Sequence, residues 1–232
     1  MPSMYEIYQS HADAYDELVR YEDHQGNLRR VLHRLVDFSG KQVVEFGAGT
    51  GRLTELYAEL AGEIRCYDRS EDMRRRAMLR LASYAGKLEY GILDHAESDP
   101  EDTRRADIVI EGWAFGHTVF DRQAHVARIT AELVDCCRRL LRPGGTMVFI
   151  ETLGTNVESP SAPGEILNAF YSELEQRHEF KRHIVSTDFR FPSLDAATRH
   201  MGFFFGQPMA QTVLARGSEV VPEFTGIWLR RG

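Results

Sequence analysis

The chain has few cysteines. It contains three among 232 residues, Cys66, Cys136 and Cys137, which is too few for a disulfide framework. Cys136 and Cys137 are neighbours in a predicted helix, and no histidine or second cysteine pair stands at the spacing of a zinc site. We therefore expect a protein of a reducing compartment, the cytoplasm, with no bound metal and with cysteines that serve packing.

Long hydrophobic runs are also lacking. No apolar stretch approaches the roughly 18–20 residues of a membrane span, and the N-terminal residues do not form the apolar segment of a signal peptide. No linker rich in Pro, Ser or Gly divides the chain, and hydrophobic residues make up 43% of it. These features predict one compact domain without a membrane segment, as a monomer or a homodimer.

Positive charge is in deficit. The chain has 28 Lys and Arg against 35 Asp and Glu, which gives a formal net charge of −7. The arginine pairs are scattered over several predicted elements and interleaved with acids, so they indicate ordinary solvated surfaces. Without a basic stripe or an RNA-binding module, we expect a small-molecule partner and no nucleic acid.

What the chain does have is a glycine-rich run from Gln42 to Thr54. A short apolar strand is followed by alternating glycines at 47, 49 and 51, and a helix is predicted to begin near Arg52. Such a strand–turn–helix unit holds a nucleoside ligand at the carboxyl edge of a parallel sheet. Side chains at the glycines would block the approach of the backbone to the ligand or force disfavoured φ angles.

The amino-acid sequence of this glycine-rich run indicates which nucleoside it binds. A dinucleotide fingerprint requires a third glycine where Arg52 stands, and Glu45 lies where a pyrophosphate would be repelled and a cation favoured. Glu45-Phe-Gly-Ala-Gly-Thr-Gly51 closely resembles motif I of the class I S-adenosylmethionine-dependent methyltransferases. The ligand of that family carries an ammonium and a sulfonium and no phosphate.

A second acidic residue strengthens the resemblance. Asp68 follows Gly51 by 17 positions, one helix and one strand, which places its carboxylate at the tip of the neighbouring strand. There it can accept hydrogen bonds from two ribose hydroxyls. The alternative is that Asp68 only caps the following helix, predicted over Glu71–Ala82, although Ser70 suits that role at least as well.

The resemblance also implies the remainder of the cofactor site. It assigns Asp94, beside His95, to the adenine amino group, and it places the small residues Gly112, Ala114 and Gly116 near the sulfonium, with Trp113 packed against the cofactor. The full predicted set is Glu45, Gly47, Ala48, Gly49, Gly51, Asp68, Arg69, Met73, Asp94, His95, Glu111, Gly112 and Trp113.

Alternating βα units predict an α/β fold, a Rossmann-like doubly wound sheet with right-handed crossovers and helices on both faces. Strands are predicted at 42–46, 64–67, 88–92, 106–110, 141–150, 183–191 and 224–229, and helices at 28–36, 52–60, 121–141, 163–177 and 193–201. By resemblance the sheet has seven strands with the last one antiparallel. Specific motifs cover residues 40–151, and the remainder fits only in pattern.

Residues 1–39 precede the first strand and are predicted to form an N-terminal helical cap or lid on a methyltransferase domain of residues 40–232. This segment contains several tyrosines. They form either a lid over the cofactor or the packed face of an amphipathic helix. We expect an acceptor pocket lined by Tyr8, Tyr15, Tyr21, His24, His117 and Glu151, with the stretch 156–163 as an entrance loop.

Methyl transfer from a sulfonium is an in-line displacement that needs mainly alignment and exclusion of water. An oxygen acceptor benefits from a general base, for which His117 is the first candidate, followed by His24; a surface or helix-capping histidine is the competing interpretation. Three functions stand: a small-molecule methyltransferase, an NAD(P)-dependent oxidoreductase, and a non-catalytic protein that binds S-adenosylmethionine. Arg52 and Glu45 argue against the second.

Overall fold

The computed structural model describes residues 4–92 and 104–232. Its centre is a seven-stranded sheet in the order β3-β2-β1-β4-β5-β9-β6. Neighbours from β3 to β5 pair in parallel, whereas β9 is antiparallel to both β5 and β6, which confirms the predicted fold class. The strands are β1 Gln42–Phe46, β2 Glu63–Tyr67, β3 Leu88–Gly91, β4 Ala106–Gly112, β5 Leu141–Thr155, β6 Lys181–Ser186 and β9 Glu223–Arg231.

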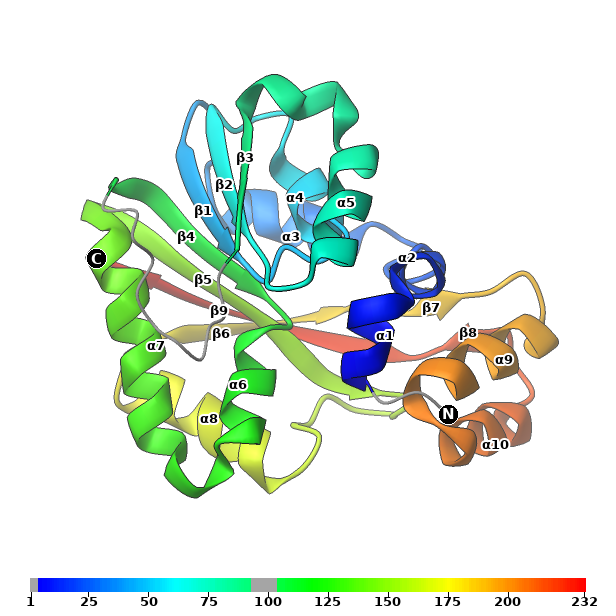
Figure 1. The fold of residues 1–232 in the computed structure, drawn as a ribbon. Helices are drawn as coiled ribbons and strands as arrows, with labels where there is room; N and C mark the ends of the chain where they lie inside the picture. The colour runs from blue at the N-terminus through cyan, green and yellow to red at the C-terminus, as the bar shows by residue number, and fades with distance from the viewer. Residues whose placement is uncertain (1–3, 93–103) are drawn as a thin grey trace.

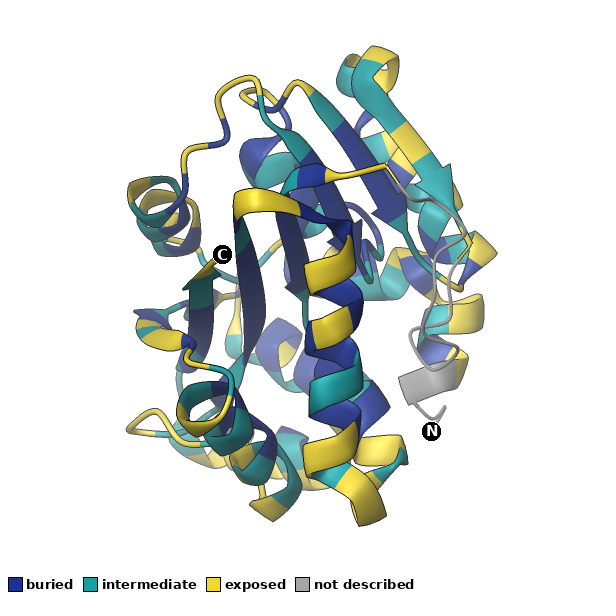
Figure 2. Cartoon of the chain, turned by 90° about the vertical axis from the view of Figure 1, so that its left-hand side faces the viewer, coloured by how far each residue is buried: buried dark blue, intermediate teal, exposed yellow. Residues whose placement is uncertain are grey.

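Helices cover both faces of the sheet (Figure 1). The helices are α1 Met4–Ser10, α2 Ala12–Val19, α3 Asn27–Leu35, α4 Arg52–Tyr57, α5 Glu71–Arg80, α6 Phe115–Asp121, α7 Val126–Leu140, α8 Glu165–Gln176, α9 Leu194–Phe205 and α10 Gln207–Arg216, with 3-10 turns at Ala82–Lys87 and Gln123–His125. One buried cluster joins the sheet to α6, α7 and α8, and a second joins it to α3 and α4. In Figure 2 the central strands are dark blue, and the outward turns of the helices are yellow.

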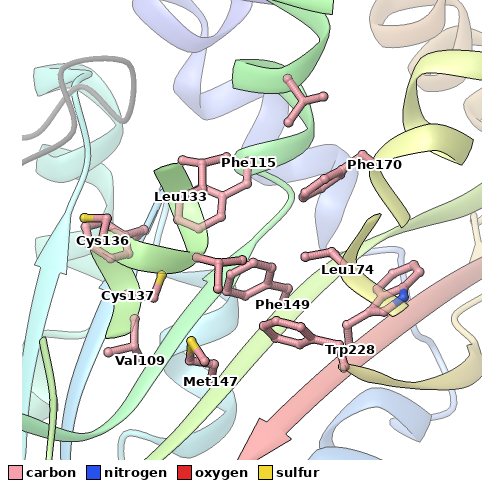
Figure 3. Close-up of a cluster of buried hydrophobic side chains, with 14 of the residues drawn as sticks. Val109, Phe115, Leu133, Cys136, Cys137, Met147, Phe149, Phe170, Leu174 and Trp228 are labelled. Carbon is pink, nitrogen blue, oxygen red and sulfur yellow. The ribbon is translucent and has the colours of Figure 1, made fainter. Parts of the chain in front are cut away.

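Alternation along β1 explains why both faces are apolar. Val44 and Phe46 belong to the α7 side of the sheet and Val43 to the α3 side, because successive side chains of a strand point to opposite faces. On the α7 side, Cys136 and Cys137 are buried in the same apolar cluster as Phe149 (Figure 3). The cysteines therefore serve as packing residues, as predicted.

Two helices differ from the sequence prediction. The predicted helix 121–141 is α7 alone, and the preceding residues, expected as a loop, form the separate short helix α6. Helix α10 was not predicted, although Pro208 near its start and Gly217 in left-handed conformation at its end are usual boundary signals.

The strand predicted at 183–191 is divided into β6 and β7 Phe189–Arg190. Strand β7 pairs with β8 Val220–Val221 in a separate two-stranded sheet.

The two N-terminal helices lie against α5, and α2 also approaches α9 (Figure 1). The buried carboxylate of Asp16 on α2 forms ion pairs with Arg76 and Arg80 of α5. Leu18 packs with Phe189 in a third apolar cluster that includes α9 and β8. The division into a lid of residues 1–39 and a domain of residues 40–232 stays a prediction. In the part of the chain that the structure describes, no helix has the length and apolarity to cross a membrane.

Candidate functional site

The glycine turn follows β1 directly and leads into α4. Gly47, Gly49 and Gly51 all have positive φ, at 67°, 55° and 81°, a region that side chains rarely adopt. A Cβ on Gly51 would lie 2.8 Å from Cδ1 of Leu81, so this glycine also lets the turn approach the element after α5. The turn therefore depends on glycine for both conformation and packing.

Asp68 joins the tip of β2 to this turn. Its Oδ2 accepts a hydrogen bond from the Gly49 N–H at 2.8 Å, and its Oδ1 accepts one from the Ser70 N–H at 2.8 Å. Burial raises the pKa of the Asp68 carboxyl, since the charged form loses hydration. The cap of α5 is Ser70, whose Oγ accepts from the Met73 N–H at 3.2 Å. Asp68 thus keeps lone pairs for a ligand.

A cavity of about 560 Å³ opens beside the turn at the carboxyl edge of the sheet. Its volume lies within the range of small-molecule sites. The cavity gathers residues from the glycine turn, from the end of β2, from the end of β4 and from α1, α2, α5 and α6. It is lined by Tyr8, Gln9, Tyr15, Gly47, Gly49, Asp68, Arg69, Ser70, Met73, Gly112, Trp113, Ala114, His117, Thr118 and Asp121.

Ten of the residues predicted for the site line this cavity. From the cofactor set these are Gly47, Gly49, Asp68, Arg69, Met73, Gly112 and Trp113, and from the acceptor set Tyr8, Tyr15 and His117. Ala48 is buried within the turn and does not line the cavity, nor does Gly51, which packs on Leu81. Asp94 and His95 lie outside the described residues.

Trp113 has a strained backbone. Its φ is 54°, which is uncommon for a bulky residue, and its N–H donates to the Ile150 carbonyl at 2.7 Å. The ring lies 3.8 Å from the guanidinium carbon of Arg52, a cation–π contact. The residue that replaces the third glycine of a dinucleotide motif therefore contacts a wall of the cavity.

Glu111 and Glu151 do not line the cavity, contrary to the sequence prediction. Glu111 Oε2 accepts from the N–H groups of Ala114 and Phe115 at 3.1 and 3.2 Å. Glu151 Oε1 accepts from the Gly116 N–H at 2.6 Å. Both carboxyls satisfy amides at the start of α6, which have no partner within the helix. Their role here is to hold α6 against the sheet.

The buried surroundings of Glu111 and Glu151 raise the pKa of both carboxyls. Burial and the charge of Glu151 raise the pKa of Glu111 well above its ordinary value. Burial raises the pKa of Glu151 to about 8. A carboxyl pair in a dry interior avoids carrying two negative charges, so it retains a proton at neutral pH.

Glu45 also lies away from the cavity. It is fully buried on the α4 side of the sheet, where Oε2 accepts from Thr54 Oγ1 at 2.8 Å and from the Tyr57 hydroxyl. Burial raises the pKa of this carboxyl to about 7. Glu45 does not line the cavity, because strand alternation turns its side chain to the other layer, and its role toward the cofactor stays a prediction.

His117 and two tyrosines meet over the cavity. The Tyr8 hydroxyl and His117 Nε2 are 3.3 Å apart, and the rings of Tyr8 and Tyr15 are edge to face at 5.5 Å. Burial lowers the pKa of His117, so its imidazole is neutral at pH 7.

Two other residues of the predicted acceptor set lie elsewhere. Tyr21 packs against Phe191, with ring centroids 4.9 Å apart, and against His200. His24 is exposed. Neither lines the cavity. The chain segment between α2 and α3 turns toward β7, since the Arg190 N–H donates to the Tyr21 carbonyl at 2.9 Å, and this long-range contact leaves no signal in the local sequence.

Several lining residues were not predicted. Thr118 and Asp121 stand one and four positions after His117 on α6, and Gln9 follows Tyr8 on α1. The spacing of His117 and Asp121 places them on one helical face, a signal that becomes readable only when this segment is recognised as a helix. Ser70 was expected only as a helix cap.

Comparison with known proteins gives consistent matches. Residues 44–147 match the family described as "Methyltransferase domain". The chain is 30% identical over 148 residues to an uncharacterized methyltransferase of Geobacillus kaustophilus, a match that covers 63% of this chain and 62% of that protein. It is 28% identical over 118 residues to the ubiquinone biosynthesis O-methyltransferase of Xanthomonas oryzae, covering 51% of this chain and 45% of that one.

Among solved structures, the complex of DhpI with S-adenosylhomocysteine superposes with a TM-score of 0.60 at 18% identity, covering 98% of this chain and 94% of that chain. At this identity the likeness concerns the fold. The sequence matches, the strand order and the glycine turn with Asp68 agree with one another. Residues 44–147 therefore match a methyltransferase domain, and the chain has the fold of the S-adenosylhomocysteine-bound DhpI structure.

Proposed function

We propose that this protein transfers a methyl group from S-adenosylmethionine to a small-molecule acceptor. The observation that carries the proposal is the convergence of Gly47, Gly49 and Asp68 with Trp113 on one cavity. Asp68 would accept hydrogen bonds from the ribose, the glycine turn would let the cofactor approach the backbone, and Met73 would pack on the adenosine. When bound, the cofactor supplies an electrophilic methyl carbon whose bond to sulfur breaks as the acceptor atom's lone pair attacks.

A small acceptor suits the lining of the cavity. Tyr8 and Tyr15 of the N-terminal helices line it together with Trp113, which follows β4, so the two tyrosines would restrict access and exclude water. The net charge of −7 disfavours a polyanionic acceptor. The O-methyltransferase activity in the name of the Xanthomonas oryzae relative is consistent with a small acceptor, although the alignment spans less than half of that protein.

Calorimetric titration with S-adenosylhomocysteine and, separately, with NAD tests the cofactor. We expect binding of S-adenosylhomocysteine and none of NAD, because no third glycine admits a pyrophosphate at the start of α4. Release of S-adenosylhomocysteine in the presence of phenols, amines, thiols and carboxylates then tests turnover. Preferential binding of NAD favours an oxidoreductase, and cofactor binding without turnover on any acceptor favours the non-catalytic function.

Substitution of Asp68 tests the ribose assignment in the same titration. Asp68→Ala should weaken S-adenosylhomocysteine affinity by roughly 1–3 kcal/mol, since two charge-assisted hydrogen bonds are lost. Asp72→Ala is the matched control, because Asp72 is the next aspartate along the chain and does not line the cavity. If Asp68→Ala binds S-adenosylhomocysteine as tightly as the parent, then Asp68 does not bind the ribose and only orders the glycine turn.

His117 is proposed as the general base for an acceptor that must lose a proton. His117→Ala should lower the turnover number by about 100-fold, the usual contribution of a positioned base, with S-adenosylhomocysteine affinity little changed. His125→Ala serves as control, because this histidine lies outside the cavity. A turnover number equal to that of the parent would exclude His117 as the base.

A further inference from the structure

Arg52 directly follows the glycine turn, but none of the proposed cofactor contacts uses its side chain. It is the first residue of α4, and its side chain is 17% exposed. The guanidinium carbon lies 3.8 Å from the centroid of the Trp113 ring, and Nη1 forms an ion pair with Glu22 Oε2. Arg52 is therefore enclosed between an aromatic ring that follows β4 and a carboxylate that follows α2.

Local energetics do not account for an arginine at this position. The amide groups at the start of a helix carry partial positive charge, so a cation in the first turn is unfavourable. A buried ion pair contributes little net stability, because both ions lose their hydration. An uncharged helix former such as leucine or methionine would suit the start of α4 at least as well. Arg52 therefore departs from the local rules, as is expected of a residue that serves a site.

Trp113 depends on its surroundings for its placement. The residue lines the cavity, and its φ is 54°. A strained backbone of this kind persists where the surrounding structure enforces it. The hydrogen bond from its N–H to the Ile150 carbonyl fixes the main chain, whereas the guanidinium of Arg52 lies over the ring. A cation attracts an aromatic face more strongly where water is excluded, so this contact fixes the side chain.

Glu22 links this contact to the N-terminal helices. The residue follows α2, whose Tyr15 also lines the cavity. The next residue, Asp23, donates its N–H to the Thr187 carbonyl at 3.1 Å, which anchors the main chain of this segment. The Glu22 side chain is 8% exposed. One ion pair thus joins the N-terminal segment to the arginine that contacts Trp113.

We propose that Arg52 is a positioning residue of this site: it holds the Trp113 ring beside the cavity, and Glu22 holds Arg52 in turn. The inference rests on the proposed methyl transfer, to which it adds a residue outside the cofactor contacts. A glycine at position 52, as in a dinucleotide-binding turn, would leave the Trp113 ring without this contact. Docking of the N-terminal segment on the rest of the chain thereby completes a wall of the cavity.

Fluorine NMR of the protein labelled with 5-fluorotryptophan tests the placement of the ring without any ligand. The chain has two tryptophans and gives two resonances, one of which disappears in Trp113→Phe and is thereby assigned. The change of a resonance between H2O and D2O measures how far the ring is exposed to water. In Arg52→Met this solvent isotope shift should rise for Trp113, because the ring loses the cation that holds it. The resonance of Trp228, which is fully buried, should not change and shows that the variant is folded.

Calorimetry with S-adenosylhomocysteine measures the consequence for the site. Arg52→Met should weaken the affinity by about three- to tenfold, as the loss of a shielded cation–π contact implies. Arg52→Lys keeps the cation but not the planar guanidinium, so it should retain part of the affinity, and it carries the same test if Arg52→Met does not fold. Glu22→Gln should also weaken binding, and its combination with Arg52→Met should lose no more than Arg52→Met alone, because both residues act through one contact. Arg128→Met, which removes an exposed ion pair on α7, should leave the affinity and both resonances unchanged.

An unchanged solvent isotope shift of Trp113 in Arg52→Met would overturn the proposal, even if binding were weaker, because Arg52 would then act on the cofactor directly. A larger isotope shift without any loss of affinity would overturn it as well, since the placement of the ring would not matter to the site. Additive losses in the double variant would refute the role of Glu22. Failure of the parent to bind S-adenosylhomocysteine would instead refute the proposed function, whereas the NMR comparison would still decide what holds Trp113.

Discussion

Glu45→Gln should become progressively more stable than the parent protein as the pH rises. Glu45 is fully buried, and its carboxyl has a pKa of about 7 in the folded state against 4.5 when unfolded. The folded protein therefore retains a proton on Glu45 that the unfolded chain releases, so the parent loses stability as the pH rises from about 4.5 to 7. Glutamine has no such proton to lose.

The expected size follows from the same linkage. Between pH 5 and pH 8, the difference in free energy of unfolding between Glu45→Gln and the parent should grow by roughly 2–3 kcal/mol. The glutamine oxygen can still accept from Thr54 and Tyr57, so the comparison isolates the buried charge. Chemical denaturation at each pH measures it.

A matched control is Glu59→Gln, at an exposed position on the segment that follows α4. Its difference from the parent should stay constant across the same pH range. A constant difference for Glu45→Gln as well would mean that the carboxyl ionises normally, which requires water to reach it through the α4 layer. His117 and His200 have lowered pKa values, so they make the folded protein more stable as the pH rises. Their contribution is the same in the variant and the parent, and it cancels when the two are compared at each pH.

Glu45 also shows where sequence reasoning succeeded and where it stopped. The alternating apolar pattern and the glycine turn were sufficient to predict β1, its turn and α4, because these depend on neighbouring residues. The same alternation places Glu45 on the face of the sheet opposite Phe46. The sequence alone could therefore have predicted that its side chain points away from the α7 layer. The prediction for Glu45 was instead argued from its charge and its position two residues before Gly47.

Other parts of the site depend on contacts between distant segments. Helix α6 was missed because Gly112 and Gly116 suggest a loop, whereas Glu111 and Glu151 stabilise the start of the helix by accepting its free amides. One of these carboxyls is 35 residues from the amide that it accepts.

Asp16→Ala should cause a large loss of stability together with weaker cofactor binding. The Asp16 side chain is 1% exposed, and Oδ2 accepts from Arg76 Nη2 and Nε at 2.9 and 3.0 Å while Oδ1 pairs with Arg80. Removal of this buried carboxylate leaves Arg76 and Arg80 paired only with the more exposed Asp13 and Glu55, which costs about 3 kcal/mol. Since the adjacent Tyr15 lines the cavity, S-adenosylhomocysteine affinity should fall as α2 loses its contact with α5.

Asp13→Ala is the control for this prediction, because Asp13 lies on the same helix, 3.4 Å from the same Arg76, but is 88% exposed. Exposed pairs contribute little, so this variant should lose less than about 1 kcal/mol. Burial alone would raise the pKa of Asp16, but Arg80 and Arg76 lower it overall. The stabilisation is therefore complete above the ordinary aspartate pKa and is lost as the pH falls below it, so the difference between Asp16→Ala and the parent should shrink in acid. Equal stability of the two alanine variants at pH 7 would show that the buried ion pairs do not fix α2 on α5.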